Sequence, residues 1–204
     1  MSPEQRAPIA IGFGFGFGLM AFVALSGCAP VLATFVQPQA PGGVIKDGFC
    51  PPQPVFLLFE RDGVVLAVHT RFVGSGRQSV YLSFEVPAHR RVRLLGTALE
   101  ATTARGEHVI SPMTGTWYGS RNREAEVRPD SLMTGNTERL RYGTNTGYRL
   151  THHDFFVFQA EYATALGDTF TVTLPKVVVD GFSWDTPQVR FVRVRRWLIT
   201  PLNC

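Results

Sequence analysis

Short apolar runs separated by Asp-Gly pairs are the feature that most constrains how this chain folds. Residues 55–59 and 64–68 are apolar and flank Asp62-Gly63. An Asp-Gly pair between two apolar runs is a strong signal for a β-hairpin. Asp180-Gly181 follows another apolar run at residues 177–179 and gives the same signal. We therefore expect antiparallel strands joined by tight turns.

Alternation of polar and apolar residues extends this prediction along the chain. Residues 79–86 alternate before Pro87, and residues 169–174 place Phe170, Val172 and Leu174 on one face. Arg195-Arg196 interrupts the last alternating run and predicts a bulge. Many short strands with frequent turns predict an all-β fold, an antiparallel β-sandwich of the immunoglobulin-like or jelly-roll type. Further strands are expected at 92–99, 107–110, 155–162 and 189–197, with turns at Gly106 and Gly167-Asp168.

Residues 111–151 differ in composition from the rest of the domain. They are rich in Gly, Asn, Thr, Ser and Arg and contain few apolar residues. We expect long loops here, with short strands only at 115–118 and 148–150. Long irregular segments inside a compact domain are usually functional or mobile, so this stretch is the first place to expect a binding surface.

The amino-terminal segment has the parts of a secretory signal. Residues 1–6 are polar, residues 7–24 are uncharged and apolar, and Leu25-Ser26-Gly27-Cys28 follows. An uncleaved anchor is the alternative, although the apolar run is at the lower limit for a membrane-spanning helix and its glycines weaken a helix. The segment resembles that of bacterial lipoprotein precursors, whose lipobox reads Leu, a small residue, Gly or Ala, and Cys.

The resemblance implies that residues 1–27 are a signal peptide and that cleavage leaves Cys28 as an acylated first residue, carrying diacylglycerol and palmitate. The residue after the cysteine is Ala29 and not Asp. In this respect the chain resembles enterobacterial lipoproteins that are sent by default to the outer membrane. We expect an outer-membrane lipoprotein facing the periplasm, with the inner membrane or cell surface as alternatives. The net charge of +4 is mild, and export makes nucleic acid a poor partner.

Residues 28–54 contain many prolines and glycines and predict an extended tether, which leaves residues 55–204 as the domain. Three cysteines are present. With Cys28 acylated, Cys50 and Cys204 remain in an oxidising compartment, and we expect a disulfide between them. In the chain-entropy model, closing the loop between these two cysteines stabilises the folded protein by at most roughly 5 kcal/mol. Free thiols or an intermolecular link are the alternatives.

Signs of catalysis are weak. His152-His153-Asp154 is the densest group of metal-competent side chains, but neighbours in a strand point to opposite faces, so only His152 and Asp154 are weak candidate ligands. A third ligand has to come from a distant histidine, and no zinc spacing or Gly-x-Ser-x-Gly elbow is present. We expect no catalytic residue and no cofactor. The distant histidines are His69, His89 and His108.

The expected function is therefore that of a lipid-anchored envelope protein whose domain is a binding or structural module. Trp117-Tyr118 and the arginines of the 111–151 segment are the candidate binding residues, because guanidinium groups suit phosphates and carboxylates. The partner is an envelope protein or an anionic glycolipid. One alternative is an envelope hydrolase or metal enzyme using His152 and Asp154. Another is an inhibitor or immunity-type lipoprotein that docks a partner through the 111–151 loops. The arginines are Arg121, Arg123, Arg139 and Arg141.

Overall fold

The structure, a computed structural model, is all-β, as the alternation predicts. It describes residues 28–46, 55–73, 76–118, 124–135, 140–144, 147–151 and 153–201. The described residues form seventeen strands, and every pair of these strands is antiparallel. The strands are β1 (Cys28–Gln39), β2 (Val44–Lys46), β3 (Phe56–Arg61), β4 (Val64–Val73), β5 (Arg77–Pro87), β6 (Arg91–Leu95), β7 (Ala98–Thr103), β8 (His108–Tyr118), β9 (Glu124–Glu126), β10 (Leu132–Thr134), β11 (Leu140–Thr144), β12 (Gly147–Thr151), β13 (His153–Tyr162), β14 (Thr169–Thr173), β15 (Lys176–Val179), β16 (Phe182–Trp184) and β17 (Val189–Pro201).

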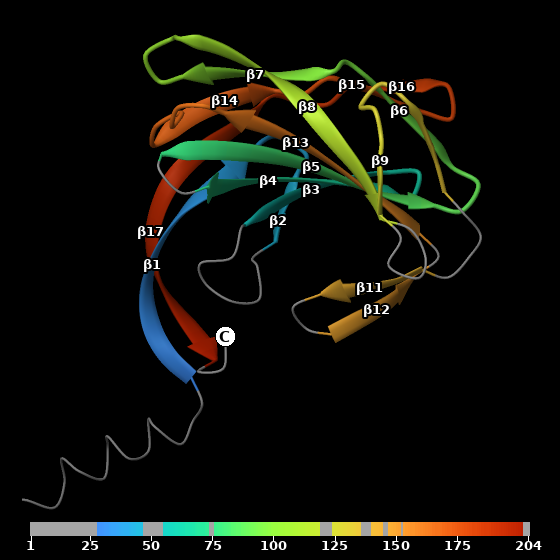
Figure 1. Ribbon diagram of the computed structural model, residues 1–204. Helices are drawn as coiled ribbons and strands as arrows, with labels where there is room; N and C mark the ends of the chain where they lie inside the picture. The colour runs from blue at the N-terminus through green and yellow to red at the C-terminus, as the bar shows by residue number, and fades with distance from the viewer. Residues whose placement is uncertain are drawn as a thin grey trace, which may run out of the picture.

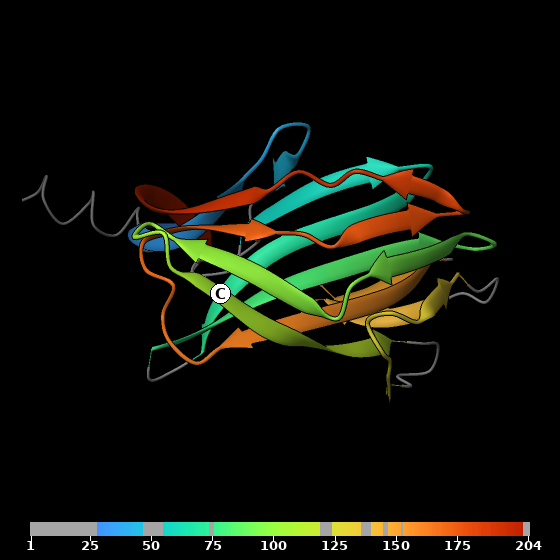
Figure 2. The same ribbon diagram turned by 90° about the horizontal axis from the view of Figure 1, so that it is seen from above.

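One large sheet dominates the fold, and it curves into a nearly closed barrel instead of the two facing layers of a sandwich (Figures 1 and 2). Its strand order is β1-β17-β14-β7-β8-β13-β5-β4-β3-β2, and β9 adds to β8. The two ends of the sheet approach each other, since β1 contacts β3 and β4. Both ends come from one segment, because only residues 40–43 separate β1 from β2.

A smaller sheet, β10-β6-β15-β16, continues the large one across a bend. β6 runs into β7 and β15 follows β14, and β6 pairs with β15 as β7 pairs with β14. The bend falls at Gly96, where an added Cβ atom would lie 3.1 Å from the Cβ of Pro175. This bend divides the strand expected at 92–99 into β6 and β7. The third sheet is the β11-β12 hairpin.

A single large cluster of apolar side chains fills the barrel and extends under the smaller sheet. Alternate residues of β4 and β5 enter it, as their period-two pattern requires. Phe84 and Phe158 meet edge to face with ring centroids 6.1 Å apart, and Phe170 stacks on Phe191 at 4.7 Å. Burying such side chains supplies the main driving force for folding.

The predicted Asp-Gly hairpins are confirmed. Asp62 and Gly63 have φ angles of 52° and 80°, and Asp180 and Gly181 have φ angles of 50° and 91°. Two consecutive positive φ angles define a type I′ turn, whose twist matches that of the strands it joins. The expected turns at Gly106 and Gly167 also have positive φ angles.

Long loops are expected at 111–151, but most of the described residues of this segment form strands. β8 runs to Tyr118, and β9, β10, β11 and β12 follow within the segment. Small residues misled the prediction, because β8 buries Ser111 and Gly115. An added Cβ at Gly115 would meet the Phe158 ring at 2.6 Å, so close packing requires glycine there. The bulge expected at Arg195-Arg196 is also wrong, since their pairing with Thr34 and Ala33 is continuous.

Residues 28–46 differ from the expected tether because they form β1 and β2. β1 lies at an end of the sheet order, and edge strands tolerate prolines such as Pro30 and Pro38. The sheet therefore begins at Cys28, well before residue 55. Residues 1–27 and 47–54 lie outside the described residues.

Candidate functional site: the ribbon that begins at Cys28

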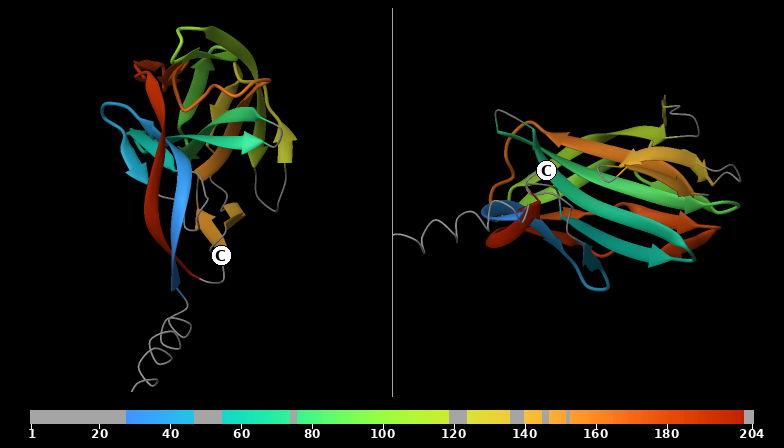
Figure 3. Two further views of the ribbon diagram at one scale, coloured as in Figure 1. Left: turned by 90° about the vertical axis from the view of Figure 1, so that its left-hand side faces the viewer. Right: turned by 90° about the horizontal axis from the view of Figure 1, so that it is seen from below.

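β1 and β17 form a long two-stranded ribbon that leaves the barrel (Figures 1 and 3). Their pairing runs without interruption from Gln39 with Arg190 to Cys28 with Pro201. β14 pairs with β17 only over Val189 to Val192. In the described residues, the remaining length of β17 has β1 as its only partner strand. We call the paired segments 28–36 and 193–201 the ribbon.

The ribbon changes chemically along its length. Near the barrel, Arg193 pairs with Asp168 at 3.0 Å and its guanidinium carbon lies 5.7 Å from the centre of the Phe72 ring. Arg195 and Arg196 follow, and the Arg196 guanidinium lies 4.9 Å from the centre of the Phe35 ring. Beyond the arginines come Trp197 and then the residues Leu-Ile-Thr-Pro, opposite Cys-Ala-Pro-Val-Leu of β1. The far end of the ribbon is thus almost entirely apolar in sequence.

The two faces of the ribbon are unequal. On one face, Ala33 and Phe35 are buried in a small cluster with Val55, against which Val194 packs. On the other face, Leu32 pairs with Trp197 and both are exposed, at 37 % and 68 %. An aromatic and an aliphatic side chain are therefore presented side by side to the surroundings, four residues from Cys28.

A second notable feature is an aromatic row on the barrel wall. Cross-strand pairing places His69 of β4 opposite Tyr81 of β5, and Phe56 of β3 contacts the His69 ring. The His69 ring stacks on Tyr81 with centroids 4.8 Å apart, and Phe56 lies 4.7 Å away. The Nδ1 atom of His69 is buried and has no hydrogen-bond partner among the described residues. Burial, and secondarily the positive charge of Arg71, lowers the pKa of His69 from 6.5 to about 4. The ring is therefore neutral at pH 7.

The candidate metal ligand Asp154 is buried in the fold and hydrogen-bonded to a neighbouring strand. Its side chain is 1 % exposed, and Oδ1 accepts a hydrogen bond from the indole N–H of Trp117 at 3.3 Å. His152 lies outside the described residues. His108 contacts Glu100 at 2.8 Å on the strand pair β7–β8, far along the sheet from His69. In the described part of the chain, no three His, Cys, Asp or Glu side chains gather as a metal site.

The structure describes only some of the candidate binding residues. Trp117 and Tyr118 end β8, where both are half-buried and Trp117 packs against the core. Arg141 lies in β11. Several arginines elsewhere are held by carboxylates, including Arg90 by Asp180 at 2.7 Å and Arg128 by Asp130 at 3.1 Å. Cys50, Cys204, Arg121, Arg123 and Arg139 lie outside the described residues.

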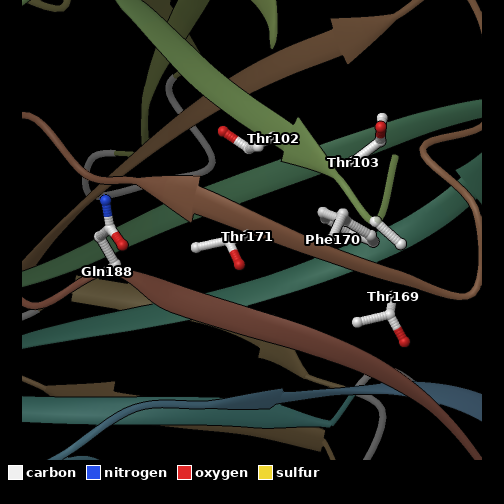
Figure 4. A pocket seen from close by; sticks show the side chains of 7 residues that line it. Thr102, Thr103, Thr169, Phe170, Thr171 and Gln188 are labelled. Atoms are coloured by element: carbon white, nitrogen blue, oxygen red, sulfur yellow. The ribbon is translucent and has the colours of Figure 1, made fainter. Parts of the chain in front are cut away.

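A small open recess of about 220 Å³ lies over β7 and β14, next to Gln188 at the start of β17 (Figure 4). Threonine hydroxyls dominate its rim, including those of Thr102 and Thr171, which pair across the strands. Sites for drug-sized ligands usually measure about 300–1,000 Å³. The recess is below that range and brings together no titratable group.

Comparison of the chain with models of protein families, with curated proteins and with solved structures found no match. Within the described residues, no helix has the length and apolar character that crossing a bilayer requires. The functional interpretation therefore depends on the chain itself, above all on the ribbon. Sequence reasoning missed Trp197 and Leu32, because only the strand register places them opposite each other near Cys28.

Proposed function

We propose that this protein is a lipid-anchored protein of the bacterial cell envelope, held in the outer membrane and facing the periplasm. Residues 1–27 act as the signal peptide and Cys28 carries the lipid, including palmitate. The nearly closed barrel acts as a binding or structural module for an envelope protein or an anionic glycolipid. Exposed arginines on β17 support this choice of partner, because guanidinium groups bind phosphates in two-point contacts.

The observation that carries the proposal is the position of Cys28. It completes Leu25-Ser26-Gly27-Cys28 and is also the first residue of β1. Its backbone lies at the far end of the ribbon, away from the barrel (Figure 3). An acyl group attached there would not have to displace any part of the core, so lipidation is compatible with the folded domain.

Metabolic labelling with radioactive palmitate tests the proposal directly. Wild-type protein should incorporate label and lose residues 1–27, whereas Cys28→Ser should accumulate as an unlabelled precursor. Cys50→Ser and Cys204→Ser are the matched controls and should be labelled as the wild type is. Label at the wild-type level in Cys28→Ser contradicts the proposed anchor.

We also propose the disulfide between Cys50 and Cys204, which the same variants test. On non-reducing electrophoresis, Cys50→Ser and Cys204→Ser should both migrate differently from the wild type, while all samples should coincide after reduction. A thiol count of two in the denatured, unreduced wild-type protein contradicts the disulfide.

A further inference from the structure

The ribbon has the chemical order of a segment that lies at a membrane surface. We propose that its tip, residues 28–33 with 196–201, docks on the anionic surface of the bilayer that holds the Cys28 lipid. In this arrangement Trp197 and Leu32 contact the interface, and Arg195, on the same face of the ribbon, contacts lipid phosphates. The inference rests on the proposed lipid anchor and adds a second, non-covalent contact to it.

The side chains of the ribbon change in a regular order with distance from Cys28. Strands rise about 3.3 Å per residue, so Leu32 and its partner Trp197 stand about 13 Å along the ribbon from Cys28. Arg195, opposite Thr34, is the next residue of β17 on the same face. Apolar residues, then tryptophan, then arginine is the sequence of side chains that a bilayer favours from the acyl boundary outward to the phosphates.

Trp197 is exposed and lies outside the apolar clusters that the described residues form. At 68 % exposure it belongs to neither apolar cluster, and its cross-strand neighbour Leu32 is exposed as well. Phe35 and Ala33, on the opposite face, are buried with Val55. The apolar pair is therefore confined to one face of the ribbon, next to the proposed anchor, where a membrane surface is within reach.

Backbone chemistry limits how deeply the tip enters. A two-stranded ribbon leaves N–H and C=O groups unpaired along its outer edges, and hydrocarbon offers no partner for them. The ribbon therefore remains in the hydrated headgroup layer, and only the acyl chains on Cys28 enter the hydrocarbon. At this depth the negative surface potential of an anionic leaflet attracts a cationic side chain.

Fluorescence quenching in reconstituted vesicles tests the contact. The purified, acylated protein is placed in vesicles of phosphatidylcholine with phosphatidylglycerol that also contain a brominated phosphatidylcholine quencher. The chain has three tryptophans, and Trp184 is buried in the core at 8 % exposure. We expect quenching of the wild-type emission and loss of that quenching in Trp197→Phe. Arg195→Gln should remove the dependence of quenching on phosphatidylglycerol.

Phe182→Ser is the matched control, because Phe182 is 71 % exposed on β16, at the end of the barrel remote from the ribbon tip (Figure 1). Its quenching should equal that of the wild type. Absence of quenching in the wild type, or equal quenching in Trp197→Phe, overturns the inference and indicates that the ribbon face is free or binds another protein. Mass spectrometry of Cys28 separates this outcome from failure of the anchor itself, since an unacylated Cys28 contradicts the proposed function whatever the quenching.

Discussion

The barrel and the ribbon are built from the same kind of strand but are stabilised differently. In the barrel, strands such as β5 have partners on both sides and alternate residues in a shared core. In the ribbon, β17 loses its β14 partner after Val192, and β1 is the only described strand that remains beside it. Isolated two-stranded ribbons are marginally stable in water. The barrel therefore determines stability, while the ribbon is available for contacts outside the fold.

The largest effect should follow from removing a core aromatic side chain. Phe158 is fully buried against Phe84, so Phe158→Ala should lower the free energy of unfolding by about 3–5 kcal/mol. Urea unfolding followed by circular dichroism measures this change. The exposed Phe182→Ala should stay within about 0.5 kcal/mol of the wild type. A similarly small change for Phe158→Ala would mean that the barrel core is not the source of stability.

A smaller effect should appear as a pH dependence of the barrel. Because the folded pKa of His69 is about 4 and its unfolded value is 6.5, the unfolded chain binds the proton first as the pH falls. The contribution of His69 to the free energy of unfolding is fully present above pH 6.5. It is lost between pH 6.5 and about 4, which lowers the free energy of unfolding by up to about 3 kcal/mol. His69→Phe should abolish this part of the profile.

Unfolding by urea at several pH values provides the measurement. His89→Asn is the control, since His89 is exposed at a turn with a φ angle of 67° and asparagine tolerates this conformation. That variant should keep the contribution of His69. Parallel profiles for the wild type and His69→Phe between pH 6.5 and 4 would refute the assignment to His69.

The smallest effect on stability should come from the ribbon. Trp197 belongs to no apolar cluster and is mostly exposed, so Trp197→Ser should change the free energy of unfolding by less than about 0.5 kcal/mol. Urea unfolding in detergent, without a bilayer, measures this change in the free energy of unfolding apart from any membrane contact. A loss comparable to that of Phe158→Ala would show that the ribbon is part of the cooperative fold and would remove the contrast between the two regions.

Local patterns predicted most of the barrel. Alternation located β5, β13 and β14, and the Asp-Gly pairs located two type I′ turns, because these features depend on neighbouring residues alone. The same patterns failed where packing between distant segments decides the outcome. Gly115 looked like a loop residue, although its lack of a side chain allows β8 to pass close to Phe158.

The ribbon was harder to predict for the same reason. Pro30 and Pro38 indicated a tether, and only the pairing with β17 makes β1 an edge strand in which proline is acceptable. The proposal of Cys28 as the lipidated residue came from its four-residue motif alone. Trp197 and Leu32 were not identified, since their proximity depends on a register between residues that are 165 positions apart (197 − 32).

Closure of the sheet by β1 and β17 has a consequence for the order of folding. The first described strand pairs with the last one, so Phe35 has no pairing partner until residue 194 has been made. Pairings of such long sequence separation form slowly, because loop entropy is lost before contacts are gained. Until then β17 is missing and the edge of β14 that it covers stays open to other chains. The interval before β17 arrives is therefore when the protein is most exposed to aggregation and to chaperones.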